Sequence, residues 1–234
     1  MIMRSYKNIG ITKTVSIIGF CALLATSAYA RNDDSKIALG AKVGTTGFGI
    51  EGRSPITENL YGRLGANYFH YNHKVGDSKL DYKGKLTLFS VPLMLDYHPS
   101  ENSGFRLSLG VGYNSNKVTA SATPNKSITL YGNTYTPQEL GKVTSKLTLG
   151  SKIAPVLSIG YDSSFISDST FSFNAELGAM YSGNPKIKVS STGLAANNKQ
   201  QIDDLNRDAN KELKKVKNYL KFYPIISIGL KYNI

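Results

Sequence analysis

Apolar and polar residues alternate strictly along four stretches of the chain, 105–114, 153–161, 171–182 and 226–234. The apolar positions of the first stretch are Phe105, Leu107, Leu109, Val111 and Tyr113. A period of two places successive side chains on opposite faces of a β-strand, so that one face is apolar and the other polar. The pattern therefore predicts a strand over each stretch, and the chain ends on the last of them.

The polar faces of these strands decide between two all-β architectures, a soluble sandwich and a transmembrane barrel. They consist largely of Gly, Ser and Ala with isolated charges, which suits the crowded interior of a narrow barrel. Aromatic residues gather at the ends of the apolar faces, as in the girdles of membrane barrels. Each stretch has about ten residues, the length that a tilted strand needs to cross a bilayer. These features favour an antiparallel transmembrane β-barrel.

The lengths of the connections predict the topology and the number of strands. Segments 54–59, 99–104 and 163–169 are short, and they alternate with segments 72–79, 119–142 and 190–217, which are mostly longer. Short turns are typical of the periplasmic side, so the other three segments are expected as outer loops.

Counting strands from Phe48 gives seven, which would leave the N-terminus outside the cell. A separate strand over 36–43, turning at 45–47 into a strand over 48–53, restores eight strands and places both ends in the periplasm. We therefore expect an eight-stranded barrel, unless 36–53 forms one bent strand.

Segment 199–221 breaks the alternation and predicts an amphipathic helix in the last outer loop. Its apolar residues recur at spacings of three and four, namely Ile202, Leu205, Ala209, Leu213, Val216 and Leu220. Its second half carries four lysines that form a basic surface, namely Lys211, Lys214, Lys215 and Lys217. Three functions stay open for this helix: a lid, a basic face for the phosphates of lipopolysaccharide, or simple packing on the barrel rim.

The N-terminal 30 residues have the layout of a secretory signal peptide. Arg4, Lys7 and Lys13 precede an apolar run over 15–24, and small residues at 28 and 30 form a cleavage site. The mature chain, 31–234, is then the barrel, exported by the Sec route to the outer membrane of a Gram-negative bacterium. The single cysteine of the chain lies in the leader, so the mature chain holds no disulfide, Cys nucleophile or thiolate metal site.

Composition and charge exclude other classes of protein. A mean hydropathy of -0.22 and a hydrophobic fraction of 41% are too low for a helical membrane bundle. The net charge of +12 is accompanied by no phosphate loop and no nucleic-acid signature, so it points to lipids or the cell surface. We expect no cofactor and no nucleic-acid partner.

The polar faces of the predicted strands direct a set of charged residues into the lumen. These candidates are Lys42, Glu51, Arg53, Arg63, Asp96, Arg106, Lys152, Asp162, Glu176 and Lys231. Acidic groups among them could attract a cationic solute along a polar path. The competing interpretation is a closed salt-bridge network that fills the interior of a barrel of eight strands.

Two histidine arrangements are candidates for catalysis or metal binding. His98 lies two residues before Ser100, but both fall in a predicted periplasmic turn, and a hydrogen bond between His98 and Asp96 would more simply be a polar contact at the rim. His70 and His73 lack a third metal ligand. We therefore predict no enzyme, no catalytic residue and no metal site.

Several motifs resemble the CarO-type small outer-membrane barrels, a family associated with uptake of ornithine and other basic amino acids. They are residues 43–49 (VGTTGFG), 152–155 (KIAP), 181–187 (YSGNPKI) and the charged helical loop that leads to Tyr223 and Pro224. The end of the chain, 227–234, is similar to the signal read by the barrel-assembly machinery. The resemblance implies a narrow channel for small polar solutes, with basic amino acids as the substrate class. The alternative is a non-conducting surface barrel whose outer loops bind lipopolysaccharide or host surfaces.

Overall fold

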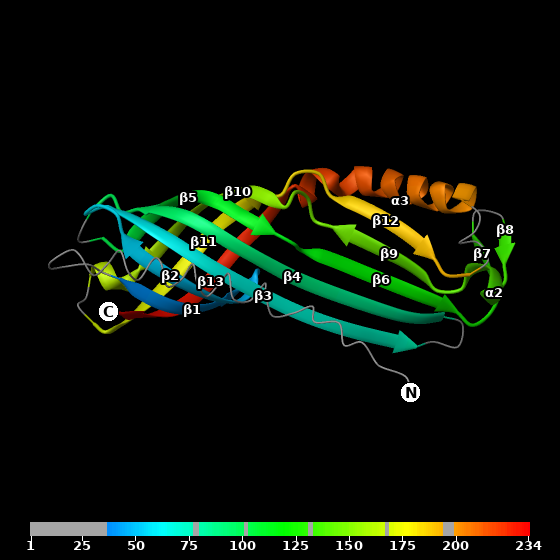
Figure 1. The fold of residues 1–234 in the computed structure, drawn as a ribbon, viewed down its shortest axis with the longest axis horizontal. Coiled ribbons are helices and arrows are strands. Elements are labelled where there is room, and N and C mark those ends of the chain that lie inside the picture. Colours follow the sequence, from blue (N-terminus) through cyan, green and yellow to red (C-terminus); the bar gives the residue numbers. More distant parts are fainter. Residues whose placement is uncertain (1–36, 77–79, 101–102, 131–132, 167–168, 194–198) are drawn as a thin grey trace, which may run out of the picture.

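The computed structural model describes residues 37–76, 80–100, 103–130, 133–166, 169–193 and 199–234. Its barrel strands are β1 (Ala38–Gly44), β2 (Gly47–Pro55), β3 (Leu60–Gly76), β4 (Leu80–Tyr97), β5 (Phe105–Asn114), β10 (Ile153–Asp162), β11 (Phe171–Tyr181) and β13 (Phe222–Asn233). Each strand pairs antiparallel with the next in this order, and β13 pairs with β1 to close the cylinder. The predicted eight-stranded antiparallel barrel is confirmed (Figure 1).

The hairpin of β1 and β2 settles the count of strands. β1 ends at Gly44 and β2 begins at Gly47, whose φ of 99° lies in the left-handed region that favours glycine. The predicted turn at 45–47 is thus confirmed, and 36–53 is not one bent strand. Because the number of strands is even, the start of β1 and the end of β13 lie at the same end of the barrel. The two strands are neighbours, as Figure 1 shows.

The outward face of the barrel is the apolar face predicted from the alternation. Leu107, Leu109 and Leu157 are more than half exposed, as lipid-facing side chains are in an isolated barrel. Aromatic pairs mark both edges of this surface: Phe105 with Tyr161 and Phe171 with Tyr232 at one edge, and Phe89 with Tyr113 and Tyr181 with Phe222 at the other. From Phe171 to Tyr181, a strand rising about 3.3 Å per residue at a tilt of about 40° covers about 25 Å, the height of the apolar band of such barrels.

Beyond the barrel, β3 and β4 continue into a second structure that we call the outer sheet. It adds β6 (Lys117–Pro124), β9 (Val143–Thr148) and β12 (Lys186–Ser191) to the distal halves of β3 and β4, in the order β12-β9-β6-β4-β3. The hairpin of β7 (Ile128–Leu130) and β8 (Asn133–Tyr135) and the short helix α2 (Pro137–Leu140) lie at its tip (Figure 1). The predicted outer loops 72–79 and 119–142 are therefore not irregular throughout, because their described residues include the end of β3, most of β6 and the whole of β7 and β8.

The outer sheet forms because the barrel strands run on through short interruptions. Asn114 and Lys117 bracket a break between β5 and β6, yet both strands keep one register against β4. Gly150 and Gly183, at φ of 71° and 72°, lie in the breaks between β9 and β10 and between β11 and β12. Local irregularities of this kind bend a strand without ending its pairing. Loop lengths taken from the sequence missed this, because the breaks resemble turns.

Helix α3 (Lys199–Leu220) confirms the predicted amphipathic helix and packs along β12. The side chain of Asn206 accepts a hydrogen bond from the amide of Val189 at 2.7 Å and donates one to its carbonyl oxygen at 3.1 Å. The free edge of β12 is thereby covered, which protects it from pairing with another chain. The packed face of the helix differs from the predicted apolar face at its C-terminal end, because Val216 is exposed and Lys217 is half-buried.

The predicted signal peptide, 1–30, lies outside the described residues. In the part of the chain that the structure describes, no helix combines the length and the apolar character needed to span a bilayer.

Candidate functional site

The lumen of the barrel is filled by three layers of side chains. A charged layer occupies the middle, an aromatic layer closes the periplasmic end, and an apolar layer lies toward the outer sheet. Nine of the ten charged residues predicted to face the lumen lie in the middle layer, and each is at least nine-tenths buried: Lys42, Glu51, Arg53, Arg63, Asp96, Arg106, Asp162, Glu176 and Lys231. The tenth prediction, Lys152, is wrong. Its side chain is exposed because it belongs to the break before β10, where the alternation is out of phase.

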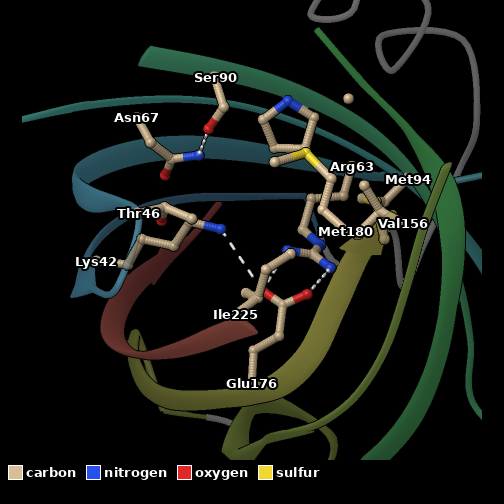
Figure 2. A pocket seen from close by; sticks show the side chains of 12 residues that line it. Lys42, Thr46, Arg63, Asn67, Ser90, Met94, Val156, Glu176, Met180 and Ile225 are labelled. Atoms are coloured by element: carbon tan, nitrogen blue, oxygen red, sulfur yellow. Dashed lines mark hydrogen bonds and ion pairs between the residues drawn. The ribbon is translucent and has the colours of Figure 1, made fainter. Parts of the chain in front are cut away.

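Arg63 is the centre of the charged layer. Its guanidinium lies 2.7 Å from Asp96, 2.8 Å from Glu176 and 3.2 Å from Glu51, so one cation joins carboxylates from three strands. Lys42 contacts Glu51 at 2.8 Å. It also lies 3.6 Å from Glu176, and Figure 2 shows Lys42 and Arg63 on opposite sides of that carboxylate. Planar guanidinium groups suit such multiple contacts, since their donors lie in a fixed fork.

A second group of ion pairs surrounds Asp162, nearer the periplasmic end. Lys231 lies 2.7 Å from Asp162 and 3.4 Å from Glu51, and thus links the two groups. Arg53 pairs with Asp162, which also accepts a hydrogen bond from the hydroxyl of Ser164 at 2.7 Å. Ion pairs in a low-dielectric interior offset their desolvation only when such additional hydrogen bonds are made. The charged layer meets this requirement around Asp162.

The aromatic layer closes the periplasmic mouth of the barrel. The short helix η2 (Ser163–Phe165) brings Phe165 against His98, with ring centroids 3.6 Å apart, and Tyr61 lies edge-on to both rings. The guanidinium carbon of Arg53 lies 4.9 Å from the centre of the Phe165 ring, which is within cation–π distance. All three rings are buried, so this end is sealed by side-chain packing.

The apolar layer lies on the other side of the charges. It consists of Met94, Ala154, Val156 and Met180, against which Tyr223 and Ile225 pack. The cavity between this layer and Arg63 measures about 20 Å³ and is shown in Figure 2. About 10 to 15 Å³ on this measure holds one water, so the cavity has room for a water molecule and not for an amino acid.

The aromatic and apolar layers are the part of the site that sequence reasoning missed. Met94 and Met180 sit at lumen-facing positions of β4 and β11, so strict counting along the alternation would have found them. Phe165 lies in a connecting segment with no periodicity, and no signal in the sequence directs it into the barrel.

The histidines form neither a catalytic pair with Asp96 nor a metal site within the described residues. Asp96 bonds Arg63 at 2.7 and 3.1 Å, and neither ring nitrogen of His98 has a hydrogen-bond partner among the described residues. His70 and His73 differ in their contacts: His70 bonds Thr87 across to β4, whereas His73 stacks on Tyr71. Within the described residues, no group of three or more His, Cys, Asp or Glu side chains is placed to hold a metal ion.

The closed cylinder, its apolar outer face and its two aromatic edges define an outer-membrane β-barrel, with strands that cross the membrane repeatedly. No protein-family model and no curated protein matches the sequence.

Solved structures that share the fold include two CarO proteins of Acinetobacter baumannii. CarO2 is 21% identical with a TM-score of 0.54, and the match covers 86% of this chain and 100% of that one. CarO is 20% identical with a TM-score of 0.55, and the match covers 87% of this chain and 100% of that one. The fold predicted from the CarO-type motifs is thus confirmed, whereas identities this low carry no activity across.

Proposed function

We propose that this protein is a closed outer-membrane barrel that acts at the cell surface through its outer sheet. The filling of the lumen is the observation that carries this proposal. Three successive layers block the interior, and the cavity beside Arg63 holds about 20 Å³. A barrel of eight strands has an interior just wide enough for side chains, so filling it in this way leaves no path for a solute. The outer sheet, by contrast, projects far beyond what the membrane anchor requires.

A channel for small polar solutes, with basic amino acids as the substrate class, is the second candidate. The observation in its favour is that the middle of the lumen is polar, with five basic and four acidic side chains among the described residues. Conduction requires that Arg63 release three carboxylates and that Phe165 and Met180 also leave the axis. Displacing one loop would not produce this rearrangement. We therefore prefer the closed barrel that acts at the cell surface to the channel.

Solute uptake into liposomes that carry the refolded mature chain separates the two candidates. Arginine and ornithine are compared with glutamate and a neutral sugar, and heat-modifiable migration on a gel shows that the barrel is folded. Liposomes with an open porin show that each uptake is measurable. The closed barrel predicts uptake equal to that of empty liposomes for all four solutes. Faster uptake of the cationic amino acids would establish the channel instead.

Recognition of the last strand by the barrel-assembly machinery belongs to the same proposal. In the folded protein β13 pairs with both β1 and β11, so it is the strand whose docking closes the cylinder.

A further inference from the structure

The two faces of the outer sheet differ sharply in chemistry. One face continues the lumen side of the barrel and carries mainly apolar residues, among them Leu86, Val118, Leu147 and Ile187. The other face continues the membrane side of the barrel. Seven lysines lie on it, and we call them the basic face: Lys74, Lys83, Lys85, Lys117, Lys146, Lys186 and Lys188. The described residues place one acidic side chain on this face, Asp81.

The strand registers place these lysines next to one another. Lys85 lies opposite Thr119, Thr119 opposite Lys146, and Lys146 opposite Lys188, so that one row crosses four strands. In the next row, Lys74 lies directly opposite Lys83. Six of the seven lysines are exposed, and Lys117 is half-buried.

Two of these cross-strand pairs, Lys74 with Lys83 and Lys146 with Lys188, place like charges face to face. Such pairs destabilise a sheet, whereas opposite charges at the same positions would stabilise it. In the described part of the chain, no ion pair of the structure involves any of the seven lysines. Like-charge pairs that no described carboxylate joins in an ion pair indicate an anion supplied from outside.

The height of the basic face above the membrane indicates which anion it meets. On β4, Phe89 marks the outer aromatic edge. Lys85 precedes it by four residues, on the same side of the strand and farther from the membrane. At about 3.3 Å per residue and a tilt of about 40°, Lys85 lies about 10 Å above that edge. This is the level of the head groups in the outer leaflet, where lipopolysaccharide carries its phosphates.

An open groove on the membrane side lies directly below the lysines of β3 and β4. It has a volume of about 430 Å³, and its rim on the membrane side consists of Phe48, Ile50, Tyr68 and Phe89 around Ala66. The short side chain of Ala66 among these larger ones leaves a depression in the lipid-facing wall. An acyl chain of the same lipid fits this depression while its phosphates reach the lysines.

We propose that the basic face of the outer sheet binds the phosphate groups of lipopolysaccharide, and that the groove below it receives an acyl chain. This inference rests on the proposed surface function and names its partner. It also relocates the site, because the sequence had suggested the lysines of α3. Lys215 of that helix is already paired with Glu212 at 2.8 Å.

The test measures binding of lipid A to the refolded mature chain in zwitterionic detergent. The basic-face variant carries Lys83→Gln, Lys85→Gln and Lys146→Gln. The control variant carries Lys211→Gln, Lys214→Gln and Lys215→Gln on α3, and therefore loses the same charge. Each basic residue near an anionic membrane surface contributes about fivefold in affinity, so the basic-face variant should bind about a hundredfold more weakly. The affinity of the control variant should change by less than threefold. Lipid A without phosphates should bind weakly to the wild-type chain and to both variants.

Equal losses in both variants would overturn the proposal, since only net charge would then matter. Full competition by millimolar inorganic phosphate would also overturn it, since the site would then take the free anion. Lys74→Glu guards against unfolding, because it replaces a repulsive pair with an attractive one. It should keep or raise the stability of the sheet while it weakens lipid A binding. Solute uptake is measured separately, so failure of lipid binding leaves the closed barrel standing.

Discussion

Replacing Arg63 with methionine tests whether the charged layer is a structural network. The substitution keeps an unbranched side chain of similar length but removes the cation that joins Asp96, Glu51 and Glu176. Glu51 keeps Lys42 at 2.8 Å, whereas the nearest remaining cation to Asp96 is Arg106 at 3.9 Å. Asp96 is fully buried, so it loses both hydrogen bonds from Arg63 and keeps only this long ion pair among the contacts described. Removing one partner of a buried pair costs about 3 to 5 kcal/mol, and we expect about 4 kcal/mol here.

Urea titration of the barrel in detergent measures this loss, with heat-modifiable migration and tyrosine fluorescence as probes. The chain has 15 tyrosines and no tryptophan, so tyrosine is the intrinsic probe. In the background of Arg63→Met, Asp96→Asn should recover about 2 kcal/mol, because it removes the buried charge that Arg63 no longer neutralises. Lys152→Met is the matched control: this exposed lysine should change stability by less than about 0.5 kcal/mol. A loss below about 1 kcal/mol for Arg63→Met, or strict additivity with Asp96→Asn, would refute the network.

Three further predictions follow from other parts of the structure. Phe165→Ala should cost about 3 kcal/mol, because a buried ring leaves a cavity against His98 and Tyr61; thermal unfolding on gels measures it, and an unchanged midpoint would contradict the aromatic layer. Asn206→Ala should speed amide exchange at Val189 at least fivefold with no change in the barrel strands; equal protection in both proteins would show that α3 does not cover β12. The amide and hydroxyl of Thr136 donate to Glu139 and lower the pKa of that carboxyl. The cap of α2 is therefore fully present above the ordinary pKa of glutamate and is lost as pH falls through the lowered pKa of Glu139, so the exchange of the Thr136 amide corrected for pH should rise in acid; a flat profile would contradict this.

The wall of the barrel could be predicted because it obeys one local rule. Along β5, β10, β11 and β13 every second residue contacts lipid, so the period of two survives in the sequence and locates strands and lumen positions together. The same rule placed nine charged residues inside. It failed at Lys152, where an extra residue in the break before β10 shifts the phase by one.

The outer sheet and the aromatic and apolar layers of the lumen could not be predicted in the same way. The distal halves of β3 and β4 are exposed on both faces. Neither face has to be strongly apolar, so the alternation that marks the barrel strands is weak there. The direction of Phe165 depends on η2 folding inward onto His98, a contact between residues 67 positions apart. The partner of Val189 is likewise a side chain of α3, set by tertiary packing rather than by any local pattern.

The conductance of planar bilayers that contain the folded wild-type barrel tests the central claim most directly. Potassium and chloride are small enough to report any continuous water path through the charged layer. The three filled layers predict a current equal to that of the bare membrane at every applied voltage, with an open porin as the positive control. Reproducible current steps from a barrel with native gel migration would contradict a closed lumen.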